Sequence, residues 1–324
     1  MSRSPLQLPD WHGRRALVTG ASSGVGVEVA RALAGAGAEV LMPVRDRGKG
    51  ERVADEIRAS TPDAQLHVRD LDLAVLDSVR GLADALRREE RPIDLLVLNA
   101  GVVLLGEHGR RVTVDGNELH LQVNFLGHAA LVLGLLPLLR RRGARVAIQC
   151  SLAAATARID WDDPQPERRY APMRAYAASK LALGLFGMEL GRRSAEVGWG
   201  IRVNLCHPGV APGTGIAPAV RALVPPVLLH AAEEHTGNPP AQAAEPALLA
   251  LASEGDGTGF FGPSGVLQLA GPGAEEPAFR RLRSPTEAAR AWRFALDRVG
   301  SGRPAGPGDR GGDAASTDGR ADGT

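Results

Sequence analysis

The stretch that decides the fold reads Thr19-Gly20-Ala21-Ser22-Ser23-Gly24-Val25-Gly26. It lies between a short β-rich run, residues 15–19, and a segment with helical apolar spacing, residues 25–36. Glycine lets the backbone turn sharply and approach a pyrophosphate closely, and the free N–H groups at the start of a helix attract anions. In this context the loop predicts nucleotide binding. The alternative is a structural turn without a ligand.

Strand-like and helix-like segments alternate along the rest of the chain. After residues 15–19, the predicted strands are 39–44, 65–71, 93–98, 145–150, 201–206 and 265–269. The predicted helices are 25–36, 48–60, 76–90, 118–139, 175–197 and 284–299. Such a βαβα series with right-handed crossovers predicts an α/β fold with a doubly wound, seven-stranded parallel sheet, that is, a Rossmann fold in a single domain.

Composition divides the chain into three parts. We expect an N-terminal extension over residues 1–13, one domain over residues 14–299 and a disordered tail over residues 300–324, where almost nothing can be buried. Within the domain, regular alternation fails over residues 211–244, where Pro, Gly and short apolar pieces mix. This stretch is interpreted either as a lid over a substrate site or as a surface excursion.

Bulk properties restrict partners and location. The 324 residues carry a formal net charge of +1, which gives no electrostatic reason to expect nucleic acid as a partner. The longest apolar run, Ala129–Leu139, is shorter than a bilayer span, and residues 1–13 lack the apolar core of a signal peptide. Cys150, Cys206 and the scattered histidines indicate neither a disulfide framework nor a metal site. We therefore expect a cytoplasmic protein without a membrane span or metal.

Tyr176-Ala177-Ala178-Ser179-Lys180 lies near the start of the helix after the fifth strand. Residues four apart share a helix face, so Tyr176 and Lys180 project the same way. A nearby ammonium lowers the pKa of a tyrosine, which would make Tyr176 a usable general acid or base. Lys180 is also one of only two lysines in the chain. Alone, this spacing is common by chance, and an ordinary amphipathic helix is the alternative.

Ser151 ends the fifth strand, and ligands of such sheets bind beyond the carboxyl ends of the strands. Its hydroxyl could donate a hydrogen bond to a substrate oxygen and stabilise charge that develops there. Cys150, the residue before it, is interpreted as core packing rather than as a redox group.

The loop spacing TGxxxGxG and the YxxxK pair resemble the single-domain branch of the short-chain dehydrogenase/reductase family, over about residues 13–296. The resemblance implies a catalytic tetrad of Asn124, Ser151, Tyr176 and Lys180. In this set Tyr176 exchanges the proton, Lys180 tunes Tyr176 and reaches the ribose, and Asn124 bends its helix and holds a water that leads to the lysine. The segment between Ser151 and Tyr176 is longer than in the simplest members. That length and residues 45–46, 115–118, 124–128 and 158–163 resemble the retinol-dehydrogenase/protochlorophyllide-reductase-like group.

The same resemblance implies a set of cofactor contacts in the loops that follow the strands. They are Gly20, Ser22, Ser23, Gly24, Val25, Gly26, Arg45, Asp72, Leu73, Asn99, Ala100, Gly101, Tyr176, Lys180, Pro208 and Gly209. Asp72 would face the adenine, with Asp70 as a rival register. Thr214 lies six residues after Pro208 rather than the usual five, which leaves its contact with the carboxamide open.

The end of the second strand distinguishes the two nicotinamide cofactors. Enzymes that use NAD tend to place an acid there for the ribose hydroxyls, but this chain has Val44 followed by Arg45. A guanidinium can form a bidentate contact with a 2′-phosphate, so the sequence favours NADP(H) over NAD(H). Asp46 complicates this reading but lies one residue late, and a surface arginine is the alternative.

Together these features predict an oxidoreductase that moves a hydride between NADP(H) and a carbonyl or alcohol carbon of a small molecule, as a monomer or homodimer. The pocket walls are expected at residues 102–105, 152–157 and 211–244, which are largely apolar, so an apolar substrate is predicted. The alternatives are a non-catalytic NADP-binding sensor or scaffold, and a reductase of an activated double bond.

Overall fold

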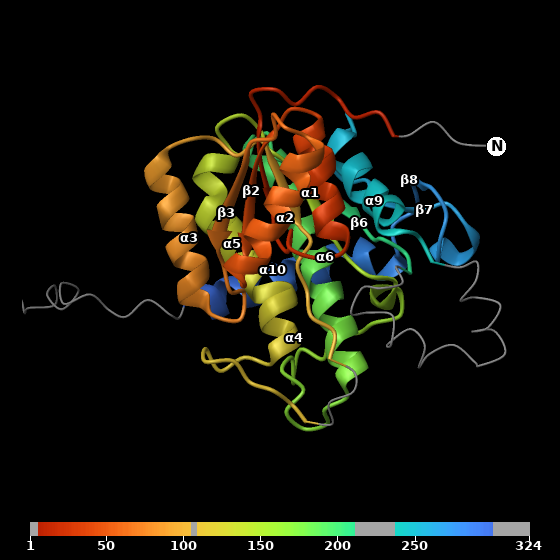
Figure 1. The fold of residues 1–324 in the computed structure, drawn as a ribbon. Helices are drawn as coiled ribbons and strands as arrows, with labels where there is room; N and C mark the ends of the chain where they lie inside the picture. Colours follow the sequence, from red (N-terminus) through yellow and green to blue (C-terminus); the bar gives the residue numbers. More distant parts are fainter. Residues whose placement is uncertain (1–5, 105–108, 211–236, 301–324) are drawn as a thin grey trace, which may run out of the picture.

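The computed structural model describes residues 6–104, 109–210 and 237–300. In these residues one sheet has the strand order β3-β2-β1-β4-β5-β6-β7-β8 (Figure 1). The strands are β1 (Arg15–Val18), β2 (Glu39–Val44), β3 (Leu66–Asp70), β4 (Leu95–Leu98), β5 (Arg145–Gln149), β6 (Arg202–Cys206), β7 (Phe260–Pro263) and β8 (Gly273–Glu275). All neighbours from β3 to β7 pair in parallel, and β8 pairs antiparallel with β7.

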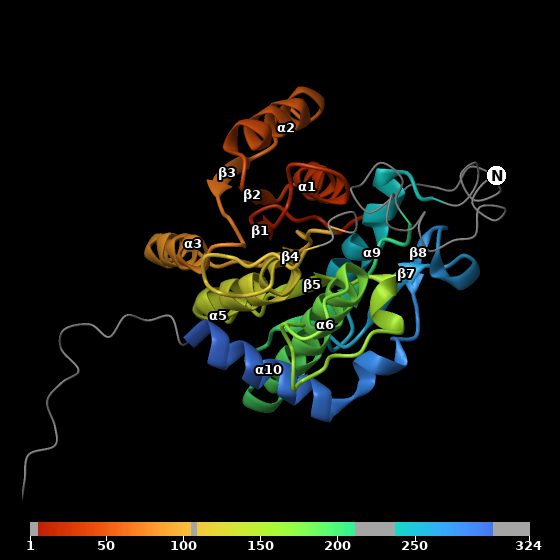
Figure 2. The same cartoon turned by 90° about the horizontal axis from the view of Figure 1, so that it is seen from below.

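Helices cover both faces of the sheet. They are α1 (Val25–Gly35), α2 (Arg47–Ser60), α3 (Leu76–Glu89), α4 (Leu119–Leu121), α5 (Gly127–Leu139), α6 (Pro172–Val197), α9 (Pro240–Ala252) and α10 (Pro285–Gly300). Figure 2 shows α1, α2 and α9 on one face and α3, α5, α6 and α10 on the other. Each face has its own cluster of buried apolar side chains, which explains why β1, β2 and β4 are buried along their whole length.

The far edge of the sheet corrects the prediction. The segment 265–269 was expected to be the last parallel strand, but β7 lies at Phe260–Pro263, and Val266–Gln268 forms a short 3-10 turn. In that turn Leu267 and Gln268 both adopt the left-handed region, with φ of 54° and 57°. The seven parallel strands are thus joined by an eighth, antiparallel strand, β8, that was not predicted.

The predicted helix 118–139 is interrupted. A π-helical turn, Gln122–Leu126, separates α4 from α5 and contains Asn124. By length and composition the 21-residue segment Leu119–Leu139, with a mean hydropathy of 1.6, could cross a membrane, and 78% of its most apolar stretch is buried inside the fold. The expectation of no membrane span rested on the shorter run Ala129–Leu139, and it remains a prediction.

Candidate active site

A cleft of about 1210 Å³ opens at the carboxyl ends of the parallel strands. Every residue predicted to contact a cofactor lines this cleft except Gly26. Ser151, Tyr176 and Lys180 of the predicted tetrad line it too, whereas Asn124 does not. Thr214 and most of the expected lid, residues 211–236, lie outside the described residues. The structure therefore brings nearly all of the predicted site residues into one cavity.

Gly26, in the first turn of α1, packs closely against the glycine loop and Asn99. A Cβ at Gly26 would lie 2.4 Å from the Gly20 carbonyl oxygen and 2.6 Å from Asn99 Nδ2. Only glycine therefore allows the first turn of α1 to pack on the loop and on the end of β4. Gly20 and Gly24 have φ of 70° and 57°, conformations that glycine adopts without strain. The loop is thus shaped to curve around a group at the start of α1.

Basic side chains stand at the end of β2. Val44 is buried, while Arg45 and Lys49 are exposed at the rim of the cleft. Within the described residues neither side chain forms a hydrogen bond or ion pair, so both are available to an anion. Asp46 is occupied elsewhere, because its Oδ1 accepts a hydrogen bond from Lys49 N at 2.9 Å and caps α2. The sequence analysis did not predict Lys49 as a site residue. The signal that could have identified it is that lysine occurs only twice in this arginine-rich chain.

The rival acids after β3 are separated by the structure. Asp72 lines the cleft, and its Oδ1 accepts a hydrogen bond from Ala74 N at 2.9 Å. Asp70 instead pairs with Arg47 on the surface, at 2.8 Å and 3.0 Å. The geometry therefore favours Asp72 as the residue that faces the cleft.

Tyr176 lies one helical turn before Lys180 on α6 and is 3% exposed. Burial raises the pKa of Tyr176, and a hydrogen bond with Ser151 opposes this only in part. The sequence predicted a lowered pKa for Tyr176; the net direction in this structure is upward, because the sequence does not display the burial of the phenol. The phenol is therefore protonated at neutral pH and is a weaker acid than an exposed tyrosine.

Lys180 is buried against the end of β5. Its Nζ donates a hydrogen bond to the Gln149 carbonyl oxygen at 3.1 Å. Burial lowers the pKa of Lys180 to about 8, although the nearby Cys150 and Cys206 thiols oppose this. Burial also raises the pKa of Cys150 to about 12, so this thiol is inert at neutral pH, as core packing predicts.

Asn124 fastens the loop after β4 instead of lining the cleft. Its Oδ1 accepts from Val102 N at 2.8 Å, and its Nδ2 donates to Val102 O at 3.1 Å and to Ser179 Oγ at 3.0 Å. A Cβ at Gly101 would lie 3.1 Å from both Asn124 Oδ1 and Lys180 Nζ, so these two atoms flank the same glycine. The predicted role of Asn124 in holding a water stays a prediction.

His128 braces the same region and was missed as a site residue. Its Nε2 lies 3.1 Å from Thr19 Oγ1 and its Nδ1 3.2 Å from the Asn124 carbonyl oxygen. Thr19 Oγ1 in turn accepts from Asn99 N and Ala100 N. Burial lowers the pKa of His128 to about 3, so the ring is neutral and links the π-helical turn to the ends of β1 and β4.

The chain is similar in sequence to several known proteins. The family model described as short chain dehydrogenase matches residues 14–222. Polyprenol dehydrogenase of Mus musculus is 43% identical over 211 residues, covering 64% of this chain and 62% of the relative. Retinol dehydrogenase 12 of Homo sapiens is 42% identical over 209 residues, covering 64% of each chain. The chain thus matches less than two thirds of the length of these relatives.

Solved structures are similar over more of the chain. An uncharacterized protein from Mycobacterium paratuberculosis superposes with a TM-score of 0.74 at 34% identity, covering 90% of this chain and 96% of the other. The RhlG/NADP active-site complex of Pseudomonas aeruginosa gives a TM-score of 0.60 at 28% identity, covering 78% and 96%. The latter structure contains NADP, by its description.

Proposed function

Because this chain belongs to the short-chain dehydrogenase family, we propose that it is an NADP(H)-dependent oxidoreductase that interconverts a carbonyl group and an alcohol on a small apolar molecule. The observation that carries the proposal is the single cleft, which brings the glycine loop, Arg45, Ser151, Tyr176 and Lys180 together. Relatives named for polyprenol and retinol, and a similar structure that holds NADP, support it.

The shape and lining of the cleft fit NADP(H). Its volume of about 1210 Å³ is large enough for a dinucleotide and a substrate together. The glycine loop at the N-terminus of α1 would hold the pyrophosphate, and Asp72 would face the adenine. Arg45 and Lys49, exposed and without a partner among the described residues, would hold the 2′-phosphate. When bound, the nicotinamide supplies or accepts the hydride.

The proton is handled by residues of the chain itself. Ser151 and Tyr176 both line the cleft, and we propose that their hydroxyls hold one substrate oxygen together. Tyr176 donates its proton to that oxygen as a carbonyl is reduced, and takes a proton back in the reverse direction. Because its pKa is raised, the phenol is protonated at neutral pH but is a weak acid, so the transfer depends on groups that stabilise the phenolate as it forms. Lys180, with a pKa of about 8, is mostly protonated at pH 7 and would stabilise the phenolate that remains.

The walls of the cleft favour an apolar substrate. Its apolar lining includes Val102, Val103, Leu104, Leu152 and Met173. Leu105 and residues 211–236, which were also expected to form walls, lie outside the described residues. A ketone or aldehyde with an aliphatic or polyene body matches this lining.

The test is a titration with NADPH and NADH, followed by measurement of NADPH consumption with apolar aldehydes and ketones. Tyr176→Phe should bind NADPH within about twofold of the wild type and lose about 100-fold or more in kcat. Loss of nucleotide binding in the wild type would refute the cofactor assignment. NADPH binding without turnover of any carbonyl would point to a sensor or scaffold, and undiminished turnover in Tyr176→Phe would refute the role of the tyrosine.

A further inference from the structure

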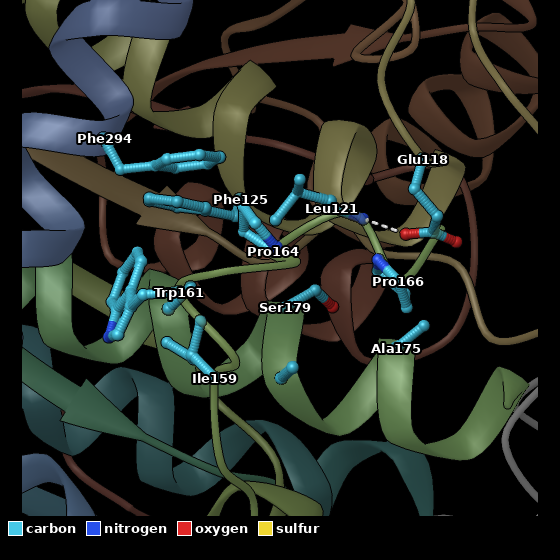
Figure 3. Close-up of a pocket in the computed structure, with 12 residues that line it drawn as sticks. Glu118, Leu121, Phe125, Ile159, Trp161, Pro164, Pro166, Ala175, Ser179 and Phe294 are labelled. Atoms are coloured by element: carbon cyan, nitrogen blue, oxygen red, sulfur yellow. Dashed lines mark hydrogen bonds between the residues drawn. The ribbon is translucent and has the colours of Figure 1, made fainter. Parts of the chain in front are cut away.

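A buried, hydrogen-bonded pair of polar side chains lies behind Tyr176, outside the cleft. Glu118 is 0% exposed and His120 1%. Glu118 Oε1 lies 2.9 Å from His120 Nδ1, and Glu118 Oε2 accepts a hydrogen bond from Leu121 N at 2.8 Å, the dashed line in Figure 3. Burial raises the pKa of Glu118, but His120 and the backbone donors outweigh it and hold the pKa below its ordinary value. The carboxylate is therefore ionised, and as a charged acceptor it strengthens the hydrogen bonds that neighbouring groups donate to it.

The pair fastens the long segment between Ser151 and Tyr176. Tyr170 donates its hydroxyl to Glu118 Oε1 at 3.1 Å. Gln165 Oε1 accepts from Glu118 N at 2.8 Å. The two contacts join residues that lie 52 and 47 positions apart in the sequence. Glu118 thus attaches this segment to the start of α4.

Packing alone does not hold the segment. A cavity of about 20 Å³ remains beneath it, next to Glu118, and its walls are mostly apolar. Figure 3 shows Ile159, Trp161, Pro164 and Pro166 of the segment facing Leu121, Phe125, Ala175 and Ser179 across this space. Hydrogen bonds therefore add to the attachment, at Glu118 and also from Trp161 Nε1 to Glu287 Oε2 at 2.7 Å.

The far side of the His120 ring reaches the cleft wall. Since Nδ1 faces a carboxylate, the hydrogen-bond network assigns the proton to Nδ1 and leaves Nε2 as an acceptor. Nε2 accepts from Leu104 N at 3.1 Å. The ring also lies edge-on to Tyr176, with 6.2 Å between centroids. Leu104 and Tyr176 both line the cleft, so one imidazole contacts the apolar wall and the tyrosine ring together.

We infer that Glu118 and His120 are positioning residues that hold the wall formed by residues 102–104 against Tyr176, and thereby set how long an apolar substrate can bind productively. The inference rests on the proposed function. His120 accepts a hydrogen bond from the backbone N–H of residue 104. It therefore fixes the distance between this wall and Tyr176 whatever side chain occupies position 104. Without this acceptor the wall relaxes, and substrates long enough to contact it lose part of their binding energy.

The first experiment compares His120→Leu with His120→Gln. Glutamine places an amide oxygen near the position of Nε2 and keeps an acceptor for Leu104 N, whereas leucine removes it. Kinetics are measured with NADPH and straight-chain aldehydes from butanal to dodecanal. His120→Leu should raise KM for the long aldehydes about tenfold and leave kcat and the Kd of NADPH within about twofold. Short aldehydes should be little affected, and His120→Gln should restore most of the KM.

A second variant covers the case in which His120→Leu does not fold. Tyr170→Phe removes one hydroxyl from Glu118 and should shift the same chain-length profile by roughly threefold. A loss that is uniform along the aldehyde series, or equal in His120→Leu and His120→Gln, would overturn the inference.

A measurement independent of turnover separates the two proposals. Amide hydrogen exchange at Leu104, read in the same proteins without substrate, should be about tenfold faster in His120→Leu than in the wild type and near wild-type in His120→Gln. If the wild type binds no NADPH or reduces no aldehyde, the proposed function fails, and exchange still decides whether the pair holds the wall. Unchanged exchange in His120→Leu would overturn the inference even in an active enzyme.

Discussion

The ammonium of Lys180 is unfavourable to bury, and Lys180→Met tests how unfavourable it is. Lys180 is 4% exposed and has one hydrogen bond from its Nζ, to the Gln149 carbonyl oxygen. Burial lowers its pKa from an ordinary value of 10.5 to about 8. A difference of this size between the folded and unfolded chains corresponds to about 3 kcal/mol of lost stability at pH 7. Methionine fills a similar volume without the charge.

The sign follows from proton binding. Between the folded pKa of about 8 and the unfolded value of 10.5, the unfolded chain holds more protons at Lys180 than the folded chain does. The free energy of unfolding of the wild type therefore rises with pH over this window, and the penalty is complete below it. Relative to Lys180→Met, the wild type should recover about 1 kcal/mol between pH 7 and pH 9.

The assay is urea unfolding of the wild type, Lys180→Met and Lys49→Met without nucleotide, at pH 7 and at pH 9. Lys49 is the other lysine, is exposed, and provides the matched control. Lys180→Met should exceed the wild type in stability most at pH 7, and its advantage should shrink at pH 9. Lys49→Met should follow the wild type at both values. A difference between Lys180→Met and the wild type that does not change with pH would refute the argument from burial.

Three further substitutions test other parts of the molecule. Gly26→Ala should lower the free energy of unfolding by about 1–3 kcal/mol and weaken NADPH binding, because its Cβ would lie 2.4 Å from the Gly20 carbonyl oxygen. Wild-type values in urea unfolding and in nucleotide titration would show instead that the loop shifts to accommodate the methyl group. Leu267→Gly should stabilise the fold by about 1 kcal/mol, since Leu267 has φ of 54° and is 79% exposed; a lower midpoint of thermal unfolding would contradict this. Arg45→Ala should weaken NADPH binding about tenfold or more and leave NADH binding unchanged; equal losses for the two nucleotides in a fluorescence titration would remove the role assigned to Arg45.

Hydrophobic periodicity predicted the centre of the sheet well, because strands covered on both faces are continuous apolar runs. β2 has its predicted bounds, Glu39–Val44. The last helix, predicted over residues 284–299, is α10, and Ser284 Oγ caps it by accepting a hydrogen bond from Glu287 N at 3.3 Å. Both signals are local, so the sequence contains them in full.

The edge beyond β6 was not predictable by the same reasoning. β7 contains Gly262 and Pro263, which usually argue against a strand, and β8 has only three residues. α9 begins with Pro240 and contains Pro246, and it is too rich in alanine to show a clear apolar stripe. Tertiary packing decides these elements, because α9 lies against α1 and the sheet in the core of one face.

The site shows the same division between local and long-range information. Motif residues such as Gly20 and Tyr176 were found because each motif is a short stretch whose neighbours define it. The contacts of Glu118 and His120 were not, since their partners Tyr170 and Leu104 lie 52 and 16 positions away. The pKa of Tyr176 was predicted in the wrong direction for a related reason: the sequence displays the neighbouring lysine but not the degree of burial.

The placement of the two lysines has a practical consequence for handling the protein. Lys49 and Lys180 are the only lysine side chains, and both line the cleft. Reagents that acylate side-chain amines will therefore reach the exposed Lys49 first and modify the rim of the nucleotide site. Coupling to a solid support through the Lys49 side chain would turn the mouth of the cleft toward the matrix and remove a positive charge from its rim.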